Sequence, residues 1–405
     1  MSTKTKIEKK YFSKYKKPLV EFPNLLETQL ASYKWLIEHG LKEVFKEFSP
    51  INDYSEKKFM LEFTSFSLGE PKFDEYYAKA NKLTYDAQLK ARVKLMNKTL
   101  GGSSKEQEIF LADIPLMTDH GTFIINGVER VIVSQLARSF GVFFTDLDLK
   151  GKKLFGAKII PARGVWIEIE SDSDGVLYVR IDKKRKFSIT SLLRVLGFTD
   201  ESMLAAAATD EVRHILKLSI EKDPAKTSDE SFIEIYKRLR DGDLATTENA
   251  KEFINSLFSS ERYDLSPVGR FRFNKRFGKP MTDKDLERRT ISKEDLMVIV
   301  EHIISLNNTP NSKADDIDHL GQRRVRYVGE LLQQKTRVGM TQIKRNIQDR
   351  MSTIDVATAL PINIINQRPL QARIKEFFTT NQLSQFMSQE NVLNEIEHLR
   401  ILSAL

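Results

Sequence analysis

The stretch Thr122-Phe123-Ile124-Ile125-Asn126-Gly127-Val128-Glu129-Arg130-Val131-Ile132-Val133 predicts a tight β-hairpin. Two apolar, β-branched runs flank an Asn-Gly pair, and both central residues of such a turn must tolerate positive φ. A second hairpin is predicted from Val165 to Asp182, with Asp172-Ser173-Asp174-Gly175 as its turn. Residues 58–110 also have the pattern of strands and loops. These segments indicate antiparallel sheets.

Helical patterns occupy most of the remaining chain. A capping box at Asn24 and Glu27 predicts a helix that ends near His39-Gly40, and a second helix is expected from Leu41 to Phe48. Further helices are predicted within residues 191–258, after Ser292 and from Tyr327 to Met351. The polar stretch from Asn307 to Ala314 is a candidate linker. The fold class is therefore expected to be α+β and multidomain, with mixed helices and antiparallel hairpins.

The composition sets limits on the class of protein. A chain of 405 residues predicts two or three domains. No apolar run approaches the roughly 20 residues of a membrane span, and the lysine-rich residues 1–20 lack the apolar core of a secretory signal. The absence of cysteine excludes disulfides and thiolate metal sites and is compatible with a reducing cytoplasm. A net charge of +8 favours an anionic partner such as nucleic acid, although many basic proteins bind none.

A mixed block of charge lies between Asp315 and Arg326. Three carboxylates and three guanidinium groups surround a glycine, at Asp315, Asp316, Asp318, Gly321, Arg323, Arg324 and Arg326. Arginine can hold phosphates or base edges and a carboxylate can accept from a base amino group, so the block indicates nucleic-acid recognition. Ion pairing within the block is an equal alternative for Arg324 and Arg326.

A metal-dependent nuclease is the enzymatic alternative for this block. Asp315, Asp316, Asp318 and His319 could in principle bind a divalent ion. Successive loop residues rarely converge on one ion, however, and arginines follow at once. The chain also has no Gly-rich phosphate-binding loop and no nucleophile elbow. We therefore expect no catalytic residue and no metal site in this chain.

Four stretches carry a family resemblance: Leu116 to Leu136, Arg262 to Arg270, Asp315 to Arg326 and Leu383 to Met387. With them the chain resembles, from about Leu19 to Leu405, the N-terminal part of the β subunit of bacterial-type, multisubunit DNA-directed RNA polymerase. The resemblance implies a protrusion domain at 1–138, an inserted lobe at 139–318, a protrusion return segment at 319–360, and the start of the fork and rifamycin-pocket region at 361–405.

The resemblance also implies a role on DNA. In this family the lobe and protrusion form one wall of the DNA cleft and contact downstream and non-template DNA. Arg138, Asp318 and Arg323 match positions that form a pocket for a non-template guanine, and Trp166 matches a residue facing the same strand. Arg324 and Arg326 are further candidates for nucleic-acid contact.

The rifamycin pocket is the family's other landmark. Its equivalents here are Val133, Gln135, Gln385, Phe386, Ser388, His398 and Ser403. Ser388 stands where the family usually has aspartate, and Ile401 where it usually has arginine, so weak rifamycin binding is expected. Val392, Leu393, Ile396 and Leu399 could instead form an apolar helix face packed on another surface.

The implied activity belongs to an assembled enzyme. The resemblance implies a nucleotidyltransferase in which this chain is accompanied by α, β′, ω and sigma subunits, template and non-template DNA, and RNA. Mg²⁺ would be held by β′, ribonucleoside triphosphates would bind only the complete enzyme, and the cytoplasm would be its location. This chain alone is expected to be inactive. The alternative is a free-standing DNA-binding scaffold of the same fold.

Overall fold

The computed structural model describes residues 23–99, 103–149, 151–240, 242, 244–355 and 359–405. The chain forms two compact units. The first unit comprises Met1–Leu136 and Val325–Leu405, and the second unit is Ala137–Arg324. The lysine-rich residues 1–20 lie outside the described residues. Because the chain leaves the first unit and later returns to it, the second unit is an insertion in the first.

The first unit is built on a four-stranded antiparallel sheet in the order β1-β2-β3-β4. Its strands are β1 (Ile51–Asn52), β2 (Phe59–Leu68), β3 (Asp86–Asn97) and β4 (Ser104–Pro115), and α3 (Glu75–Ala80) lies between β2 and β3 in the chain. Buried residues alternate with more exposed ones along β3, because successive side chains point to opposite faces. One face of the sheet therefore supplies the core.

The second helix of this unit has the predicted bounds Leu41–Phe48, whereas the start of the first helix and the predicted break between the two differ. α1 (Glu27–Trp35), a π-helical turn (Leu36–Gly40) and α2 (Leu41–Phe48) follow without a break. The expected end at His39-Gly40 is wrong, because Gly40 keeps helical angles while Leu36 and Leu41 on either side are fully buried. The capping box is also wrong: Leu26 caps α1 without a side-chain bond, and Asn24 accepts from the Leu26 N–H.

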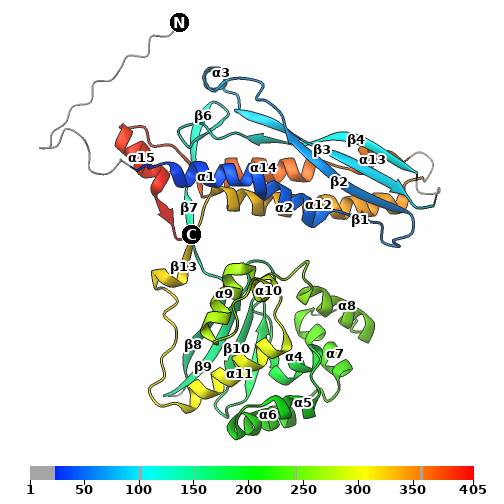
Figure 1. Ribbon diagram of the computed structural model, residues 1–405, viewed down its shortest axis with the longest axis vertical. Helices are drawn as coiled ribbons and strands as arrows, with labels where there is room; N and C mark the ends of the chain where they lie inside the picture. Colours follow the sequence, from blue (N-terminus) through cyan, green and yellow to red (C-terminus); the bar gives the residue numbers. More distant parts are fainter. Residues whose placement is uncertain (1–22, 100–102, 150, 241, 243, 356–358) are drawn as a thin grey trace, which may run out of the picture. The chain divides into compact units, whose positions relative to one another are not determined.

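The long predicted helix is confirmed as α12 (Val328–Thr353). It is followed by α13 (Pro361–Ile364), α14 (Arg368–Thr380) and α15 (Val392–Arg400). Figure 1 shows α12 and α14 beside the large sheet of the first unit. Gly329 permits a close approach to α1, since a Cβ there would lie 2.2 Å from the Ser32 carbonyl oxygen.

Two three-stranded sheets complete the first unit and its connections, in the orders β14-β6-β5 and β13-β7-β15. Their strands are β5 (Phe123–Ile125), β6 (Val128–Ile132), β7 (Ser134–Arg138), β13 (Arg323–Arg326), β14 (Ser384–Phe386) and β15 (Leu402–Ser403). The Asn-Gly hairpin is confirmed: Ile125 pairs with Val128, and Asn126 and Gly127 have φ of 51° and 79°. β15 runs parallel to β7, whereas β6 is antiparallel to both β5 and β14.

The second unit has a five-stranded antiparallel sheet in the order β12-β11-β10-β9-β8. Its strands are β8 (Gly141–Leu149), β9 (Lys152–Ile160), β10 (Ile167–Ser171), β11 (Leu177–Ile181) and β12 (Phe187–Ser188). Pairing of β10 with β11 confirms the second predicted hairpin. The helices are α4 (Ile189–Val195), α5 (Asp200–Ala206), α6 (Asp210–Lys222), α7 (Ser228–Leu239), α8 (Thr247–Phe258), α9 (Ser266–Arg276), α10 (Asp283–Glu287) and α11 (Lys293–Asn308), with a 3₁₀ turn at Leu320–Gln322.

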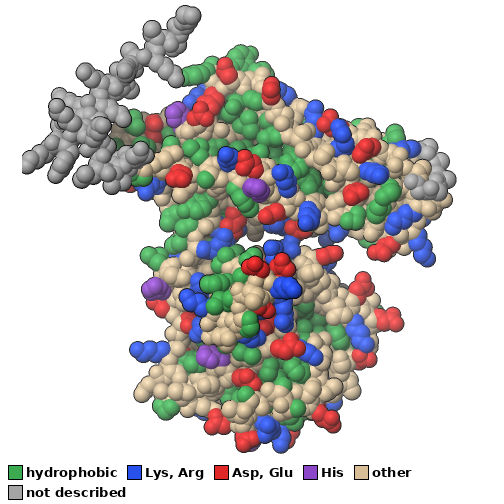
Figure 2. All heavy atoms as spheres, in the orientation of Figure 1, with side chains coloured by type: hydrophobic (Ala, Val, Ile, Leu, Met, Phe, Trp, Pro, Cys, Tyr) green, Lys and Arg blue, Asp and Glu red, His purple; other side chains and the backbone are tan. Residues whose placement is uncertain are grey.

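The α+β fold class is confirmed by these elements. The predicted capping of α11 by Ser292 is confirmed, because its hydroxyl accepts from the Asp295 N–H at 3.2 Å. The linker expected at Asn307 to Ala314 is wrong, since this stretch begins inside α11 and the second unit continues to Arg324. The described helices include none long and apolar enough to cross a membrane. Basic and acidic side chains are interspersed over the visible face of each unit (Figure 2).

Candidate nucleic-acid interface

The loop from Asp315 to Arg326, here called the acidic–arginine loop, is anchored to α9. The Asp315 carboxylate accepts two hydrogen bonds from Arg276, at 2.8 and 3.0 Å, and a third from the Phe144 N–H at 2.7 Å. The Arg276 guanidinium also lies 4.5 Å from the centroid of the Phe144 ring. Asp315 is therefore committed to holding the loop on the second unit.

A second arginine of α9 fixes the far end of the loop. Arg272 donates to the Ser139 hydroxyl and to the Gly321 carbonyl, both at 3.2 Å, and also to the Gln322 side chain. Burial lowers the pKa of Arg272, and the carboxylate of Asp315 opposes this shift. The Ser139 N–H donates to the Gln322 carbonyl at 2.9 Å. The segments bearing Arg138 and Arg323 are thus held side by side.

Within the loop, the acidic residues have different roles. The Asp316 carboxylate accepts from the N–H groups of Asp318 and His319, at 3.1 and 3.2 Å, and so closes a local turn. His319 Nδ1 accepts from the Gly321 N–H at 3.0 Å. Asp318 is exposed, and within the described residues its carboxylate has no hydrogen bond or ion pair. Of the three acids, only Asp318 accepts no hydrogen bond from another group of the described residues.

The candidate arginines also differ. Arg138 is exposed, with no hydrogen bond or ion pair of its side chain in the part of the chain that the structure describes. Arg324 lies 4.5 Å from the centroid of the Phe140 ring. Arg326 donates to Gln135 at 3.1 Å and forms a 3.4 Å ion pair with Glu330, so it is engaged inside the first unit. Internal pairing thus accounts for Arg326 without DNA.

Trp166 makes contacts different from those of the other candidate residues. It is partly buried just before β10, and its carbonyl accepts from the Asp182 N–H at 3.0 Å. In the described residues no hydrogen bond or ring contact joins it to Arg138 or Asp318. The structure therefore brings together Arg138, Arg323 and the acidic–arginine loop, and does not itself connect Trp166 to them.

Sequence reasoning missed Arg272 and Arg276, the two residues that hold the loop. Their signal was present, because they stand four residues apart on the helix that follows Ser266-Pro267 and therefore share one face. Nothing in the sequence indicated that this face meets the Asp315 loop, some forty residues away. In the described residues, no group of three His, Asp or Glu side chains is placed so that it could hold a metal ion.

The rifamycin-pocket equivalents lie in the first unit, where β14 pairs with β6 and β15 with β7. His398 is buried: its Nδ1 accepts from the Ser388 N–H at 3.2 Å, so its Nε2 donates to Gln385 at 3.1 Å. Burial lowers the pKa of His398, which favours the neutral ring. Val133 is buried and donates to the Leu383 carbonyl. The remaining equivalents are Gln135 and Ser403, paired in register, and Phe386, which is 62% exposed.

The C-terminal helix α15 has only part of the apolar face that its sequence suggested. Leu399 is buried, whereas Val392 and Leu393 are 69% and 79% exposed. Ile401, at the position where the family usually has arginine, is 46% exposed. Within this chain the helix is therefore held mainly through Leu399 and His398.

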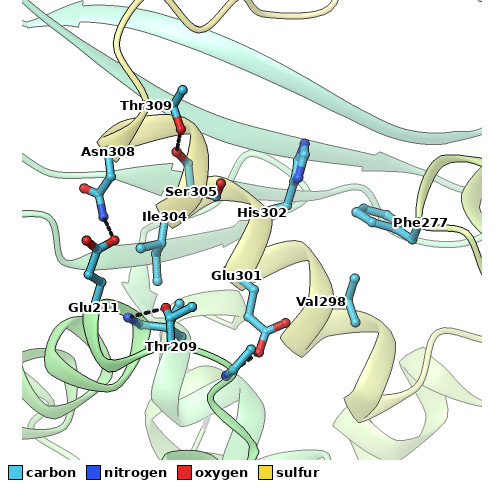
Figure 3. Close-up of a pocket in the computed structure, with 12 residues that line it drawn as sticks. Thr209, Glu211, Phe277, Val298, Glu301, His302, Ile304, Ser305, Asn308 and Thr309 are labelled. Carbon is cyan, nitrogen blue, oxygen red and sulfur yellow. Dashed lines mark hydrogen bonds between the residues drawn. The ribbon is translucent and has the colours of Figure 1, made fainter.

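The second unit also contains a hollow of about 520 Å³ between α11 and the start of α6, which Figure 3 shows. Glu211 accepts from Asn308 at 2.7 Å and so joins α6 to α11, and Glu301 accepts from the Ala208 N–H at 3.0 Å and so joins α11 to the loop before α6. His302 packs on the Phe144 ring at 4.5 Å between centroids, and burial lowers its pKa. The groove's polar groups thus have structural roles, and it contains none of the predicted site residues.

Comparison with known proteins places the chain in a class. Residues 139–326 match the family described as RNA polymerase Rpb2, domain 2, and this match covers nearly all of the second unit. The chain is 45% identical, over 97% of its length, to the DNA-directed RNA polymerase subunit beta of Syntrophomonas wolfei, and 43% identical, over 99%, to that of Chloroflexus aggregans. Over nearly its whole length the chain is therefore similar to DNA-directed RNA polymerase β subunits, the family that its sequence resembles.

The chain spans about 35% of the length of each of these relatives. Both are named as polymerase subunits, which gives no support to the alternative of a free-standing DNA-binding scaffold.

Proposed function

We propose that this chain acts within an assembled, cytoplasmic RNA polymerase as one wall of the DNA cleft. It grips downstream and non-template DNA while nucleotidyl transfer takes place elsewhere in the complex. The partners are α, β′, ω and sigma subunits, both DNA strands and the RNA. In this assignment residues 1–138 and 319–360 form the protrusion, residues 139–318 form the lobe, and residues 361–405 begin the fork.

One observation carries the DNA-contact assignment. The exposed Asp318 carboxylate has no hydrogen bond or ion pair among the described residues, whereas the other two acids of the loop accept hydrogen bonds from this chain. A free carboxylate can accept from the amino and imino groups of guanine, and arginine can contact guanine acceptors or a phosphate. Arg138 and Arg323 stand on adjacent segments near this loop. Trp166 would supply a stacking surface to the same strand. Arg324 adds positive charge, and Arg326 is the weakest member of the set.

The assignment is tested by Asp318→Asn in the assembled polymerase. Loss of the charge should reduce discrimination in favour of guanine at the pocket by about 1–3 kcal/mol. The control is Asp316→Ala, which removes the acceptor that orders the loop and should weaken all sequences alike. An unchanged guanine preference in the Asp318 variant would exclude this role.

Mg²⁺ belongs to another subunit in this proposal. The carboxylates closest in sequence, Asp315 and Asp316, already accept hydrogen bonds from Arg276 and from loop amides, so they do not form a divalent site. This chain's residues therefore position DNA and perform no step on the nucleotide. Native mass analysis should find the chain in a complex with α and β′; recovery of the chain alone, still bound to DNA, would contradict the assembly.

We also propose that rifamycins bind weakly. Ser388 provides no carboxylate and Ile401 no guanidinium, so two charged groups typical of the pocket are missing. Binding to an assembled complex should be weaker than micromolar, which corresponds to about −8 kcal/mol. The paired substitution Ser388→Asp with Ile401→Arg should strengthen it. Micromolar or tighter binding before substitution would refute the proposal.

A further inference from the structure

Part of β2 has an open edge in the first unit. Its strand neighbours are β1 and β3, and β1 pairs only with Met60 and Leu61. The Ser49 hydroxyl then accepts from the Phe63 N–H at 3.0 Å. Beyond that point, as far as Leu68, no strand of the described residues pairs with β2 on the side opposite β3. Such an edge presents backbone groups that can pair with another chain.

The direction of the free backbone groups follows from the pairing with β3. Ser67 is paired with Lys90, and the Gly69 N–H donates to the Gln88 carbonyl at 2.9 Å. Backbone groups alternate in direction along a strand, so those of Phe66 and Leu68 point away from β3. A bulge between Phe63 and Ser65 precedes this stretch and leaves the residues after it in regular register.

A groove of about 620 Å³, here called the edge groove, lies against this edge. Its apolar lining includes Ile37 and three phenylalanines: Phe45 lies 5.5 Å from Phe63 and 5.0 Å from Phe66 between ring centroids. Aromatic rings offer a large apolar contact area to an inserted side chain. The groove and the open strand are therefore one continuous surface.

The charge beside the edge groove is positive. Lys42 and Lys46, one turn apart on α2, are exposed, and neither has an ion pair among the described residues. The Glu38 carboxylate lies 3.8 Å from Lys34, and Glu62 is in register with Lys94 on β3. The lining thus holds two ammonium groups without an ion pair and one such carboxylate, Glu62, among the described residues, so its net charge is positive.

We propose that the edge groove and the β2 edge are a docking site for an extended, acidic and apolar segment of a separate protein. The segment adds a strand at Phe66 and Leu68, inserts one apolar side chain among the phenylalanines, and places carboxylates near Lys42 and Lys46. A second copy of this chain fits less well, because its own edge carries the same excess of positive charge. The inference does not depend on DNA binding.

The test uses the 405-residue chain and a labelled peptide of about eight residues that alternates valine or isoleucine with aspartate or glutamate. Binding should protect the amides of Phe66 and Leu68 from hydrogen exchange. A peptide with alternate amides N-methylated keeps the same charges but cannot pair, and should bind at least about tenfold more weakly.

Substitutions of the lysines test whether charge contributes to binding of the peptide. Lys42→Glu with Lys46→Glu should weaken binding about tenfold or more, and folding should be retained because both side chains are exposed. Lys57→Glu, an exposed lysine outside the groove, should change it by less than about twofold. The proposal is overturned if the peptide does not bind, if N-methylation has no effect, if protection appears at β4 instead, or if the chain alone dimerises with the same protection.

Discussion

Removal of Asp295 should destabilise the second unit more than removal of any exposed acid. Asp295 is 1% exposed and accepts from Arg270 and Lys279, both at 2.8 Å. Arg270 is itself 2% exposed, and its remaining N–H groups donate to the carbonyls of Arg288 and Thr290. This network fixes α9, which also presents Arg272 and Arg276 to the acidic–arginine loop.

The magnitude follows from burial. Asp295→Ala leaves the Arg270 guanidinium buried without its counter-charge, which costs about 3–5 kcal/mol. It also removes the acceptor for the Ser292 N–H at the start of α11. The control is Asp146→Ala: Asp146 and Lys153 lie 2.8 Å apart but are 40% and 52% exposed, so about 1 kcal/mol or less is expected.

The two tryptophans permit a selective assay. Trp35 lies in α1 of the first unit and Trp166 in the second unit, so in a Trp35→Phe background fluorescence reports urea unfolding of the second unit. Equal losses for Asp295→Ala and Asp146→Ala would refute the reasoning.

The pH dependence gives an independent check. Burial raises the pKa of Asp295, but the bonds from Lys279 and Arg270 outweigh it and the net shift is downward. A lowered folded-state pKa contributes stability above the unfolded value of about 3.9, and this contribution is lost as pH falls through the folded value. The unsubstituted chain should therefore lose more stability than Asp295→Ala on acidification below about pH 4.

Three further predictions concern other contacts. Gly329→Ala should destabilise the first unit by about 1–3 kcal/mol in urea unfolding, because the new Cβ would meet Ser32. The control is Thr341→Ala, on the exposed face of α12, and equal effects of the two substitutions would contradict close packing at Gly329. Arg276→Ala should speed hydrogen exchange at the Phe144 amide, and unchanged exchange would show that Asp315 is held without it. In an NMR titration the pKa of His398 should lie below its ordinary value of about 6.5, and an ordinary pKa would contradict its burial. Because the folded-state pKa is lowered, the neutral ring favours folding above about pH 6.5, and this contribution to stability is lost as pH falls.

Some turns and helix caps could be predicted from the sequence, because each depends on residues that are close together in the chain. The Asn126-Gly127 turn follows from the need for positive φ at both positions, and the Ser292 cap of α11 from one hydroxyl and the amide three residues on. The family, too, was predicted from contiguous stretches. Prediction failed at Gly40, where burial of the flanking leucines overrides glycine's weak helix propensity.

Which charged groups are free to contact a ligand depends on the packing of distant segments against one another. In the sequence Asp315, Asp316 and Asp318 are equivalent acids in one run, yet folding gives two of them internal donors and leaves Asp318 exposed. The partner that commits Asp315 stands on α9, far away in the chain, and no local pattern reports such a pairing. Hydrogen bonds and desolvation depend on distances across the fold, so only the packed chain distinguishes a structural carboxylate from one free to contact a ligand.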